Sequence, residues 1–379
     1  MTNIFTTLSR TNHDPININK LDIYRIGGEC KYEVFRSNKL GSGRYSNVYL
    51  GRCLNRDKIL QIGRSDGIVA IKKINMFGVS FDTHKMLLNE IAIMKKIIQY
   101  EHPNIIMCYD VIEDIDTTYI VMEYCGDGHL GNILIKPMKL VNIKYYFRQL
   151  LSALYFLHSY DILHRDVKPT NILLTNDKKN LKICDFGFAK ITTKMQRVST
   201  ICGSPLYMAP EILNHKKYDS ACDIWALGMI LFEMMYGYHP CGNCKDIDEL
   251  TDYISKKKIK FPPVGEINNT LDNECIELLT RMLEIDDTKR ITLAELFIHP
   301  WFIDNSKQNA ANLNDQTNTH IEEFKYIDTK STSSQNETLY DFLSLKNDFD
   351  DLYCFSDDLI KIATDSSRSS VCMFELDDV

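Results

Sequence analysis

The sequence predicts an α+β fold in which a small β-rich part precedes a larger helical part. Alternating and β-branched segments, such as 68–72 and 119–125, gather in the first third of the chain. Helical periodicity dominates afterwards, most plainly over 142–158. A loop with charged residues between apolar flanks, 162–174, follows that helix directly, so we expect a polar site in this loop.

Length and composition are those of a globular protein with an acidic end. The chain has 379 residues, of which 44% are hydrophobic and 25% are charged, so a sizeable core is possible. Residues 303–379 hold 16 acidic and 6 basic side chains, a net charge of −10, whereas the whole chain has −7. We expect a flexible segment over 1–31, a folded domain over 32–302 and a disordered acidic tail after it.

The apolar runs and the cysteines point to an intracellular protein. The first residues lack the cationic-then-apolar order of a signal peptide, and the longest apolar run, 224–232, is too short to span a membrane. The twelve cysteines have no framework spacing, which favours thiols in a cytoplasmic protein. Cys241 and Cys244 form a CxxC without a second pair, which predicts a plain loop, with metal binding as the alternative.

A glycine-containing turn is the first candidate for phosphate binding. Gly41 and Gly43 would let a hairpin bring backbone N–H groups against phosphates, and Val48 could pack on a flat base. Ser46 stands where a third glycine would complete the pattern, and it is small enough to permit close approach of the backbone. A polar connection over 55–67 is expected next.

A strand and a helix follow that connection. Lys72 ends the β-branched run 68–72, and Lys73 must face the opposite side because adjacent side chains on a strand alternate. Glu90 lies on the apolar face of a predicted helix over 83–98. A buried carboxylate there needs a partner, so an ion pair with Lys72 is expected.

Two polar segments near the middle of the chain suit chemistry on an anionic substrate. The loop 162–174 presents Asp166, Lys168 and Asn171, and so many polar groups cannot be buried without partners. Asp185 follows an apolar strand and precedes Phe-Gly, a good position for a carboxylate that binds a hard cation.

The order and spacing of these motifs resemble those of eukaryotic-type Ser/Thr protein kinases. His164-Arg-Asp-Val-Lys-Pro-Thr-Asn171 matches the catalytic loop, including the Lys that marks the Ser/Thr class. Asp185-Phe-Gly lies 19 residues after Asp166 (185 − 166), and 202–211 matches the end of the activation segment. The resemblance covers residues 32–302 and implies the bilobal protein-kinase fold, with a β-rich N-lobe and a larger helical C-lobe.

The same resemblance implies roles for individual residues. Asp166 would accept the proton of the substrate hydroxyl, Lys168 would stabilise the γ-phosphate, and Lys72 would orient the other phosphates of ATP. Asn171 and Asp185 would hold Mg²⁺. The implied ATP site consists of Leu40, Gly41, Ser42, Gly43, Val48, Ala70, Lys72, Glu90, Met122, Glu123, Cys125, Leu173 and Asp185.

Supporting contacts are implied as well. Glu211 would pair with Arg290, and Asp223 would brace the catalytic loop. Thr200 lies in the activation segment, where a phosphate on its hydroxyl could bind Arg165 and order the segment.

Substrate and partner preferences are less sharply implied. His129 and Thr170 stand where kinases that favour arginine before the target carry acidic residues, so a strongly basic consensus is not implied. Phe188 goes with serine acceptors in the family. The tail segments 340–343 and 349–352 have the form of short motifs that dock ubiquitin-like adaptor proteins, and an unspecific acidic tail is the alternative.

An active kinase is therefore the leading hypothesis, with ATP, Mg²⁺ and protein substrates as its partners and no nucleic acid. The patterns 123–130, 185–190 and 202–211 resemble the autophagy-initiating kinase group. The alternative is a pseudokinase scaffold that binds partners through the fold and the acidic tail, and a small-molecule kinase is a distant third.

Overall fold

The structure is a computed structural model in which most of the chain between residues 22 and 302 is described. The described residues are 22–28, 31–43, 45–62, 64–175, 178–192, 198, 200, 202–256, 259–262 and 273–302. The acidic tail and both docking motifs predicted in it lie outside the described residues. The chain divides into two units, 1–291 and 292–379.

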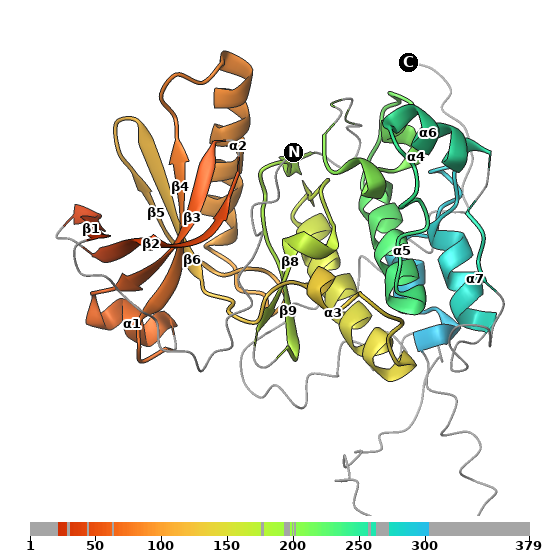
Figure 1. The fold of residues 1–379 in the computed structure, drawn as a ribbon, viewed down its shortest axis with the longest axis horizontal. Coiled ribbons are helices and arrows are strands. Elements are labelled where there is room, and N and C mark those ends of the chain that lie inside the picture. The colour runs from red at the N-terminus through yellow and green to blue at the C-terminus, as the bar shows by residue number, and fades with distance from the viewer. Residues whose placement is uncertain are drawn as a thin grey trace, which may run out of the picture. The chain divides into compact units, whose positions relative to one another are not determined.

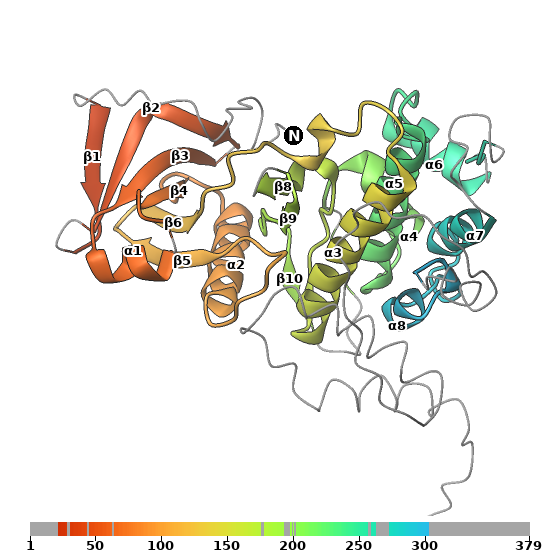
Figure 2. The ribbon, with the colours of Figure 1, turned by 90° about the horizontal axis from the view of Figure 1, so that it is seen from below.

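The first unit opens with a six-stranded antiparallel sheet (Figures 1 and 2). Its strands, in spatial order, are β1 (Ile23–Ile26), β2 (Tyr32–Ser42), β3 (Ser46–Cys53), β4 (Ile68–Asn75), β6 (Thr117–Glu123) and β5 (Cys108–Glu113). Val34, Ile71 and Val121 are fully buried in one hydrophobic cluster on this sheet. Such β-branched residues are typical of strands. Helix α2 (Phe81–Ile97) packs against β5 of the sheet.

Strand β1 corrects the expectation of flexibility over 1–31. Ile23 to Ile26 pair with Phe35 to Tyr32, and Tyr24 packs on the core cluster of the sheet. The strand has four residues, so its period of two is too short to stand out beside an Asn-rich stretch. The expected domain boundary at residue 32 stays a prediction, since much of the preceding segment is outside the described residues.

Helix α1 (Arg56–Ile62) replaces the polar connection expected over 55–67. The Asn55 side-chain oxygen accepts hydrogen bonds from the N–H groups of Asp57 and Lys58, at 2.9 and 3.1 Å. Such a side chain satisfies the first unpaired N–H groups of a helix. Seven residues make only two turns, so no apolar periodicity announces the helix.

The rest of the first unit is mainly helical. Its helices are α3 (Leu140–Ser159), α4 (Pro210–Leu213), α5 (Ala221–Tyr236), α6 (Ile247–Ser255) and α7 (Asn273–Met282). The short strands β7 (Ile162–Leu163) and β10 (Lys190–Ile191) pair, as do β8 (Ile172–Thr175) and β9 (Asn180–Ile183). These elements confirm the predicted α+β fold with a β-rich and a helical lobe.

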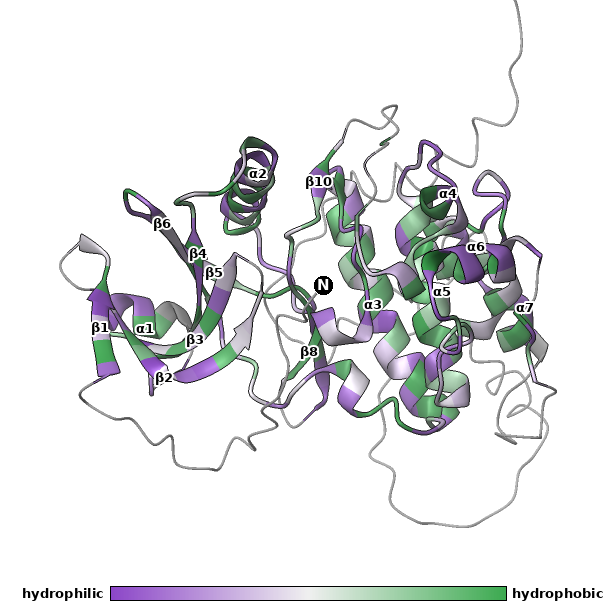
Figure 3. Cartoon of the chain, turned by 45° about the horizontal axis from the view of Figure 1, so that its top comes forward, coloured by the Kyte–Doolittle hydropathy of each residue, from purple (hydrophilic) through white to green (hydrophobic). Residues whose placement is uncertain are grey.

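Helix α5 is the core of the helical lobe. Fourteen of its 16 residues are buried, and α3 and α7 pack against it, so it is apolar on nearly every side (Figure 3). Gly228 permits the close approach of α7's end, since a Cβ there would lie 2.8 Å from a methyl group of Leu283. None of the described helices is long and apolar enough to cross a membrane.

The second unit is described only over 292–302. Helix α8 (Leu293–Phe297) begins with a capping box, in which Glu295 N–H donates to the Thr292 hydroxyl at 3.2 Å and Thr292 N–H donates to the Glu295 carboxylate at 2.8 Å. A 3₁₀ turn, η6 (Pro300–Phe302), follows it.

A buried ion pair joins α4 to the segment that follows α7. The Arg290 guanidinium donates to both carboxylate oxygens of Glu211, at 2.7 and 2.8 Å, and stacks 5.2 Å from the Trp225 ring. Both charged side chains are at most 3% exposed. This pair is the one that the sequence predicted.

We expect Arg290→Met to lower the free energy of unfolding by about 3–5 kcal/mol, because it leaves the Glu211 carboxylate buried without a partner. The matched control is Lys95→Met, which breaks an exposed pair with Glu113 and should cost less than about 1 kcal/mol. Urea unfolding measures both. Equal losses in the two variants would contradict the structural role of the Glu211–Arg290 pair.

A half-buried acid, Glu233, lies near the other end of α5. The Tyr207 hydroxyl, in the 3₁₀ turn η5 (Pro205–Tyr207), donates to Glu233 at 2.6 Å. Burial raises the pKa of Glu233 to about 7, although the Tyr207 hydrogen bond lowers it. Because the folded-state pKa exceeds the ordinary one, Glu233 favours the folded state most at low pH, and this contribution is lost as the pH rises through about 7.

The side chain of glutamine does not ionise, so we expect Glu233→Gln to gain stability relative to wild type as the pH increases. Between pH 5 and pH 8 the difference in unfolding free energy should grow by about 1–3 kcal/mol. Denaturant unfolding across this pH range measures it. Glu101→Gln changes an exposed residue and is the control, so its unfolding free energy should depend on pH as that of wild type does. The same wild-type pH dependence in Glu233→Gln would contradict a raised pKa of Glu233 in the folded protein.

Candidate active site

Lys72 of β4 connects three elements. Its ammonium contacts the Glu90 carboxylate of α2 and lies 3.1 Å from Asp185 Oδ1, which follows β9. All three side chains are less than 10% exposed. The neighbouring Lys73 faces the other side of the sheet, over the rings of Tyr24 and Tyr119, so the predicted alternation and the Lys72–Glu90 pair are both confirmed.

Charge complementarity keeps Lys72 and Asp185 ionised. Burial alone would lower the pKa of Lys72, but Asp185 and Glu90 raise it above its ordinary value. Burial would raise the pKa of Asp185, and the Lys72 ammonium reverses this and lowers it. Lys72 therefore remains a cation and Asp185 an anion at neutral pH.

The backbone of the loop after β7 is fixed by Asp223 at the start of α5. Its carboxylate accepts the N–H groups of His164 and Arg165, at 3.0 and 2.9 Å, and lies 2.8 Å from His158 Nε2. Burial raises the pKa of Asp223, but the His158 hydrogen bond is the largest effect that lowers it, and the net shift is downward. The expected bracing of the loop is thus confirmed.

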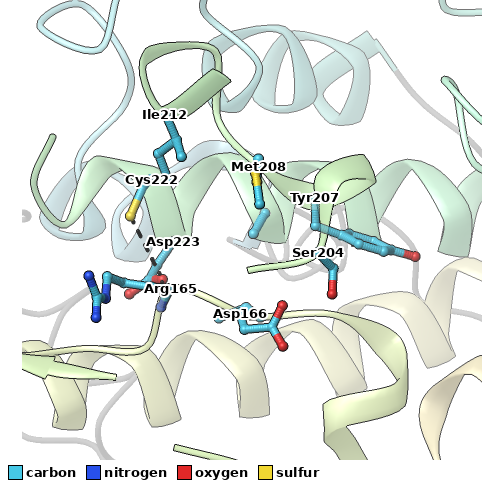
Figure 4. Close-up of a pocket in the computed structure, with 10 residues that line it drawn as sticks. Arg165, Asp166, Ser204, Tyr207, Met208, Ile212, Cys222 and Asp223 are labelled. Atoms are coloured by element: carbon cyan, nitrogen blue, oxygen red, sulfur yellow. Dashed lines mark hydrogen bonds between the residues drawn. The ribbon is translucent and has the colours of Figure 1, made fainter. Parts of the chain in front are cut away.

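This bracing holds an unusual backbone conformation. Arg165 has φ +64°, which is uncommon outside glycine and costs of order 1–3 kcal/mol. Figure 4 shows the result, since the Arg165 guanidinium and the Asp166 carboxylate point in opposite directions. Arg165 and Asp166 therefore contact different parts of the protein, although they are adjacent in the loop.

The two carboxylate oxygens of Asp166 differ in their contacts. Oδ2 accepts hydrogen bonds from Lys168 Nζ at 2.8 Å and from Asn171 Nδ2 at 2.9 Å. Oδ1 is buried and has no hydrogen-bond partner among the described residues. One oxygen is thus held in place, and the other is available to accept a proton from a substrate.

Ser204 of the activation segment lies beside this carboxylate (Figure 4). Its hydroxyl accepts a hydrogen bond from Lys168 Nζ at 2.6 Å. Asp166, Ser204 and Tyr207 line a cavity of about 10 Å³, close to the space that one water molecule needs. The activation segment therefore closes directly over the catalytic loop.

Asn171 and Asp185 offer oxygen ligands suited to Mg²⁺. The Cys184 N–H donates to the Asn171 carbonyl at 2.9 Å, which holds the two segments together. Asp185 has φ +65°, a second strained position at this site. No group of three or more His, Cys, Asp or Glu suited to a metal occurs in the described part of the chain, but Mg²⁺ bound through phosphates needs only one or two carboxylates.

The expected phosphate-binding turn joins β2 to β3. Gly41 pairs with Val48 and Ser42 with Asn47, and the Gly43 N–H donates to the Ser46 carbonyl at 2.7 Å. The turn is therefore a tight hairpin, as the glycines predicted. Leu40, at its start, is half-buried against the Phe35–Leu50–Ile68 cluster.

The other expected ATP-site residues lie on adjacent strands. Val48 pairs with Lys72, and Ala70 pairs with Met122, so one face of the sheet carries small and apolar groups beside the ammonium. Leu173 of β8 is 6% exposed and bridges to His129. The assignment of these residues to an ATP site stays a prediction.

The connector after β6 combines a structural side chain with an available backbone donor. The Glu123 carboxylate pairs with Lys182 at 2.8 Å, a contact that no local pattern in the sequence announces. Within the described residues, the Cys125 N–H makes no backbone hydrogen bond. That donor fits the edge of an adenine base, which carries hydrogen-bond acceptors.

Sequence reasoning missed Tyr218, which contacts the catalytic loop from the far end of the activation segment. Its hydroxyl accepts from Arg165 Nη1 at 3.0 Å and donates to the Thr200 carbonyl at 2.6 Å. Arg165 Nε also donates to the Phe188 carbonyl at 2.6 Å. A lone tyrosine carries no spacing signal, so only the fold could reveal this link.

Comparison with known proteins agrees with this geometry. The family model described as "Protein kinase domain" matches residues 34–302. A protein of Acanthamoeba polyphaga mimivirus that carries a serine/threonine-protein kinase name is 36% identical over 308 residues, which are 74% of this chain and 65% of the relative.

Two further relatives carry the names of serine/threonine-protein kinases. ULK3 of Homo sapiens is 36% identical over 270 residues, covering 70% of this chain and 54% of ULK3. ATG1a of Arabidopsis thaliana is 35% identical over 266 residues, covering 69% of this chain and 40% of ATG1a. The chain thus spans between two fifths and two thirds of the length of these relatives, and the similarity to eukaryotic-type Ser/Thr kinases is confirmed. Because the family model matches well over half of its residues, the chain belongs to the protein kinase domain family.

Proposed function

We propose that this protein is a Ser/Thr protein kinase that transfers the γ-phosphate of ATP to serine or threonine hydroxyls of protein substrates. The observation that carries the proposal is Asp166, with Oδ2 fixed by Lys168 and Asn171 and with Oδ1 left to accept a proton. The relatives' names support the same activity.

Each of these residues would have its own role in the phosphate transfer. The hairpin turn after β2 would cover the phosphates of ATP with backbone N–H groups, and Lys72, fixed by Glu90, would bind their oxygens. The substrate hydroxyl would attack the γ-phosphorus while its proton passes to Asp166 Oδ1, and ADP would leave with the electrons of the broken P–O bond. Lys168 would donate to the transferring group.

Asp185 and Asn171 would hold Mg²⁺, which when bound neutralises negative charge on the phosphates. The ionised state of Asp185, maintained by the Lys72 ammonium, is what a cation ligand requires. A scaffold without activity is disfavoured, since Lys72, Asp166 and Asp185 are all present and the first and last of them already touch.

We further infer that the kinase domain spans 32–302, that the acidic tail is a separate segment, and that the protein is cytoplasmic. The nine described cysteines are thiols, which supports a reducing compartment. ATP and protein substrates are available there. Docking of partners by the tail stays a hypothesis.

Asp166→Asn tests the proposed activity. The change is nearly isosteric and opens no cavity, so we expect phosphate transfer from Mg-ATP to a mixed Ser/Thr peptide library to fall about 10²–10⁴-fold. The thermal midpoint should stay within a few degrees of wild type. Asp57→Asn, an exposed change on α1, is the matched control and should retain full transfer.

Radiolabel transfer to the library measures both variants and reads the consensus at once. Equal transfer by wild type and Asp166→Asn would overturn the proposed role of Asp166. Absence of transfer by well-folded wild type would instead favour the scaffold. Lys72→Met is a poorer test, because it leaves the buried Glu90 and Asp185 carboxylates without their cation.

Thr200 tests control by phosphorylation. The residue is exposed, and its carbonyl is tied through Tyr218 to Arg165, with which no carboxylate pairs among the described residues. A phosphate there, with a charge of about −2, could accept charge-assisted hydrogen bonds of roughly 1.5–3 kcal/mol each from Arg165.

We expect Thr200→Ala to lower peptide phosphorylation at least about tenfold, which corresponds to one such bond. Mass spectrometry of active wild type should find the phosphate on Thr200, and the exposed Thr280→Ala should behave as wild type. Full activity of Thr200→Ala together with an unmodified segment would rule out this switch.

A further inference from the structure

The loop between α5 and α6 carries two cysteines that the proposed kinase activity does not use. Cys241 is 1% exposed and Cys244 is half-buried, and both are thiols in the structure. Gly242 and Asn243, which separate them, are exposed. The pair is therefore accessible from one side while one of its sulfurs is protected.

Two successive turns fold this loop back on itself. The Gly242 N–H donates to the His239 carbonyl at 3.0 Å, and the Cys244 N–H donates to the Cys241 carbonyl at 3.1 Å. The first and last Cα atoms of a four-residue turn lie within about 7 Å, and a disulfide needs roughly 4.4–6.8 Å. The backbone thus already holds Cys241 and Cys244 at a separation that a disulfide can span.

Electrostatics also link the two thiols. The pKa of the Tyr253 phenol, on α6, is raised first by burial and then by Cys241 and Cys244, and the pKa of the Cys241 thiol is raised to about 12, first by burial and then by Cys244. No metal-binding group of three or more side chains occurs in the part of the chain described, this loop included. Dithiol chemistry therefore suits the pair better than the metal alternative left open by the sequence.

The loop is linked to the segment beside the catalytic site. The Cys241 N–H donates to His239 Nδ1 at 3.0 Å, and the His239 ring meets the Tyr207 ring edge-on with 5.0 Å between centroids. Tyr207 is in turn bonded to Glu233 and lines the cavity next to Asp166. Burial lowers the pKa of His239 to about 4, so its neutral ring can accept the Cys241 N–H at physiological pH.

We propose that Cys241 and Cys244 form a reversible disulfide, a redox modification site that shifts the Tyr207 segment through His239. The oxidant is a hydroperoxide. Cys244, the more accessible sulfur, attacks its terminal oxygen, the O–O bond breaks, an alcohol or water leaves, and Cys244 becomes a sulfenic acid. Cys241 then attacks that sulfur, the S–O bond breaks and a second water leaves.

The balance is two thiols and one hydroperoxide giving one disulfide, one alcohol or water and one water. The cysteine pair loses two electrons and the peroxide gains them. A dithiol reductant reverses the change by attack on the sulfur of Cys244, the more accessible of the two. Intracellular disulfides are usually transient and redox-sensing, which fits a bond of this kind.

The modification itself is tested without reference to kinase activity. The full-length protein is treated with hydrogen peroxide, remaining thiols are alkylated, and peptides are analysed by mass spectrometry. We expect a peptide with Cys241 and Cys244 joined, lost after dithiothreitol and absent from Cys244→Ser. Cys53→Ala, in β3, should form the bond as wild type does.

Separate alkylation of both cysteines after peroxide would overturn the proposal. So would a sulfinic acid on Cys244 without pairing, or pairing of either cysteine with another thiol. Because Cys241 is buried, Cys241→Ala serves as the second blocking variant only if its thermal midpoint matches that of Cys244→Ser. If the two midpoints differ, Cys244→Ser by itself is sufficient as the blocking variant.

The link to Tyr207 rests on the proposed kinase function and is tested by steady-state kinetics. Oxidised wild type should show a KM for a peptide substrate raised about tenfold, with the KM for ATP unchanged, since a shift of about 1 Å can cost up to 10²-fold. Cys244→Ser should be insensitive to peroxide. An unchanged peptide KM in fully disulfide-bonded enzyme would overturn the link, while absence of all transfer would count against the kinase proposal alone.

Discussion

The ammonium group of Lys72 sets the condition on which the site depends. Its two carboxylate partners come from positions 18 and 113 residues further along the chain. An ion buried without a partner costs several kcal/mol, so β4 can bury this side chain only when α2 and the segment after β9 are both in place. The requirement that positions the Lys72 ammonium is thus the same one that packs the β-rich lobe against Asp185.

Asp223 imposes a similar condition on the catalytic loop. Its carboxylate receives two successive N–H groups, from His164 and Arg165, and this geometry accompanies the positive φ of Arg165. With this backbone, Arg165 and Asp166 present their charges to opposite sides (Figure 4). The strain is small beside the free energy of several charge-assisted hydrogen bonds, so the loop can remain in one conformation before any substrate binds.

The sequence predicted those parts of the molecule in which chemistry and periodicity coincide. Glu90 on an apolar helical face and Lys72 at the end of a buried strand each need a partner, which is why their pairing could be foreseen. Strand β1 and helix α1 are too short for a periodic signal. The contacts of Tyr218 with Arg165, and of Glu123 with Lys182, join residues distant in sequence and depend on tertiary packing. Such contacts leave no local trace.

Helix α5 unites these features because it is a buried rod with an acid near each end. Asp223 anchors the catalytic loop, and Glu233 anchors Tyr207. Ten residues (233 − 223) correspond to about 15 Å along a helix, a spacing that the apolar surroundings of α5 keep fixed. The cysteine loop follows the Glu233 end directly, so a change there can reach the Tyr207 segment while the catalytic loop keeps its anchor. The anchor of the catalytic loop and the anchor of the Tyr207 segment are thus separate contacts of one buried helix.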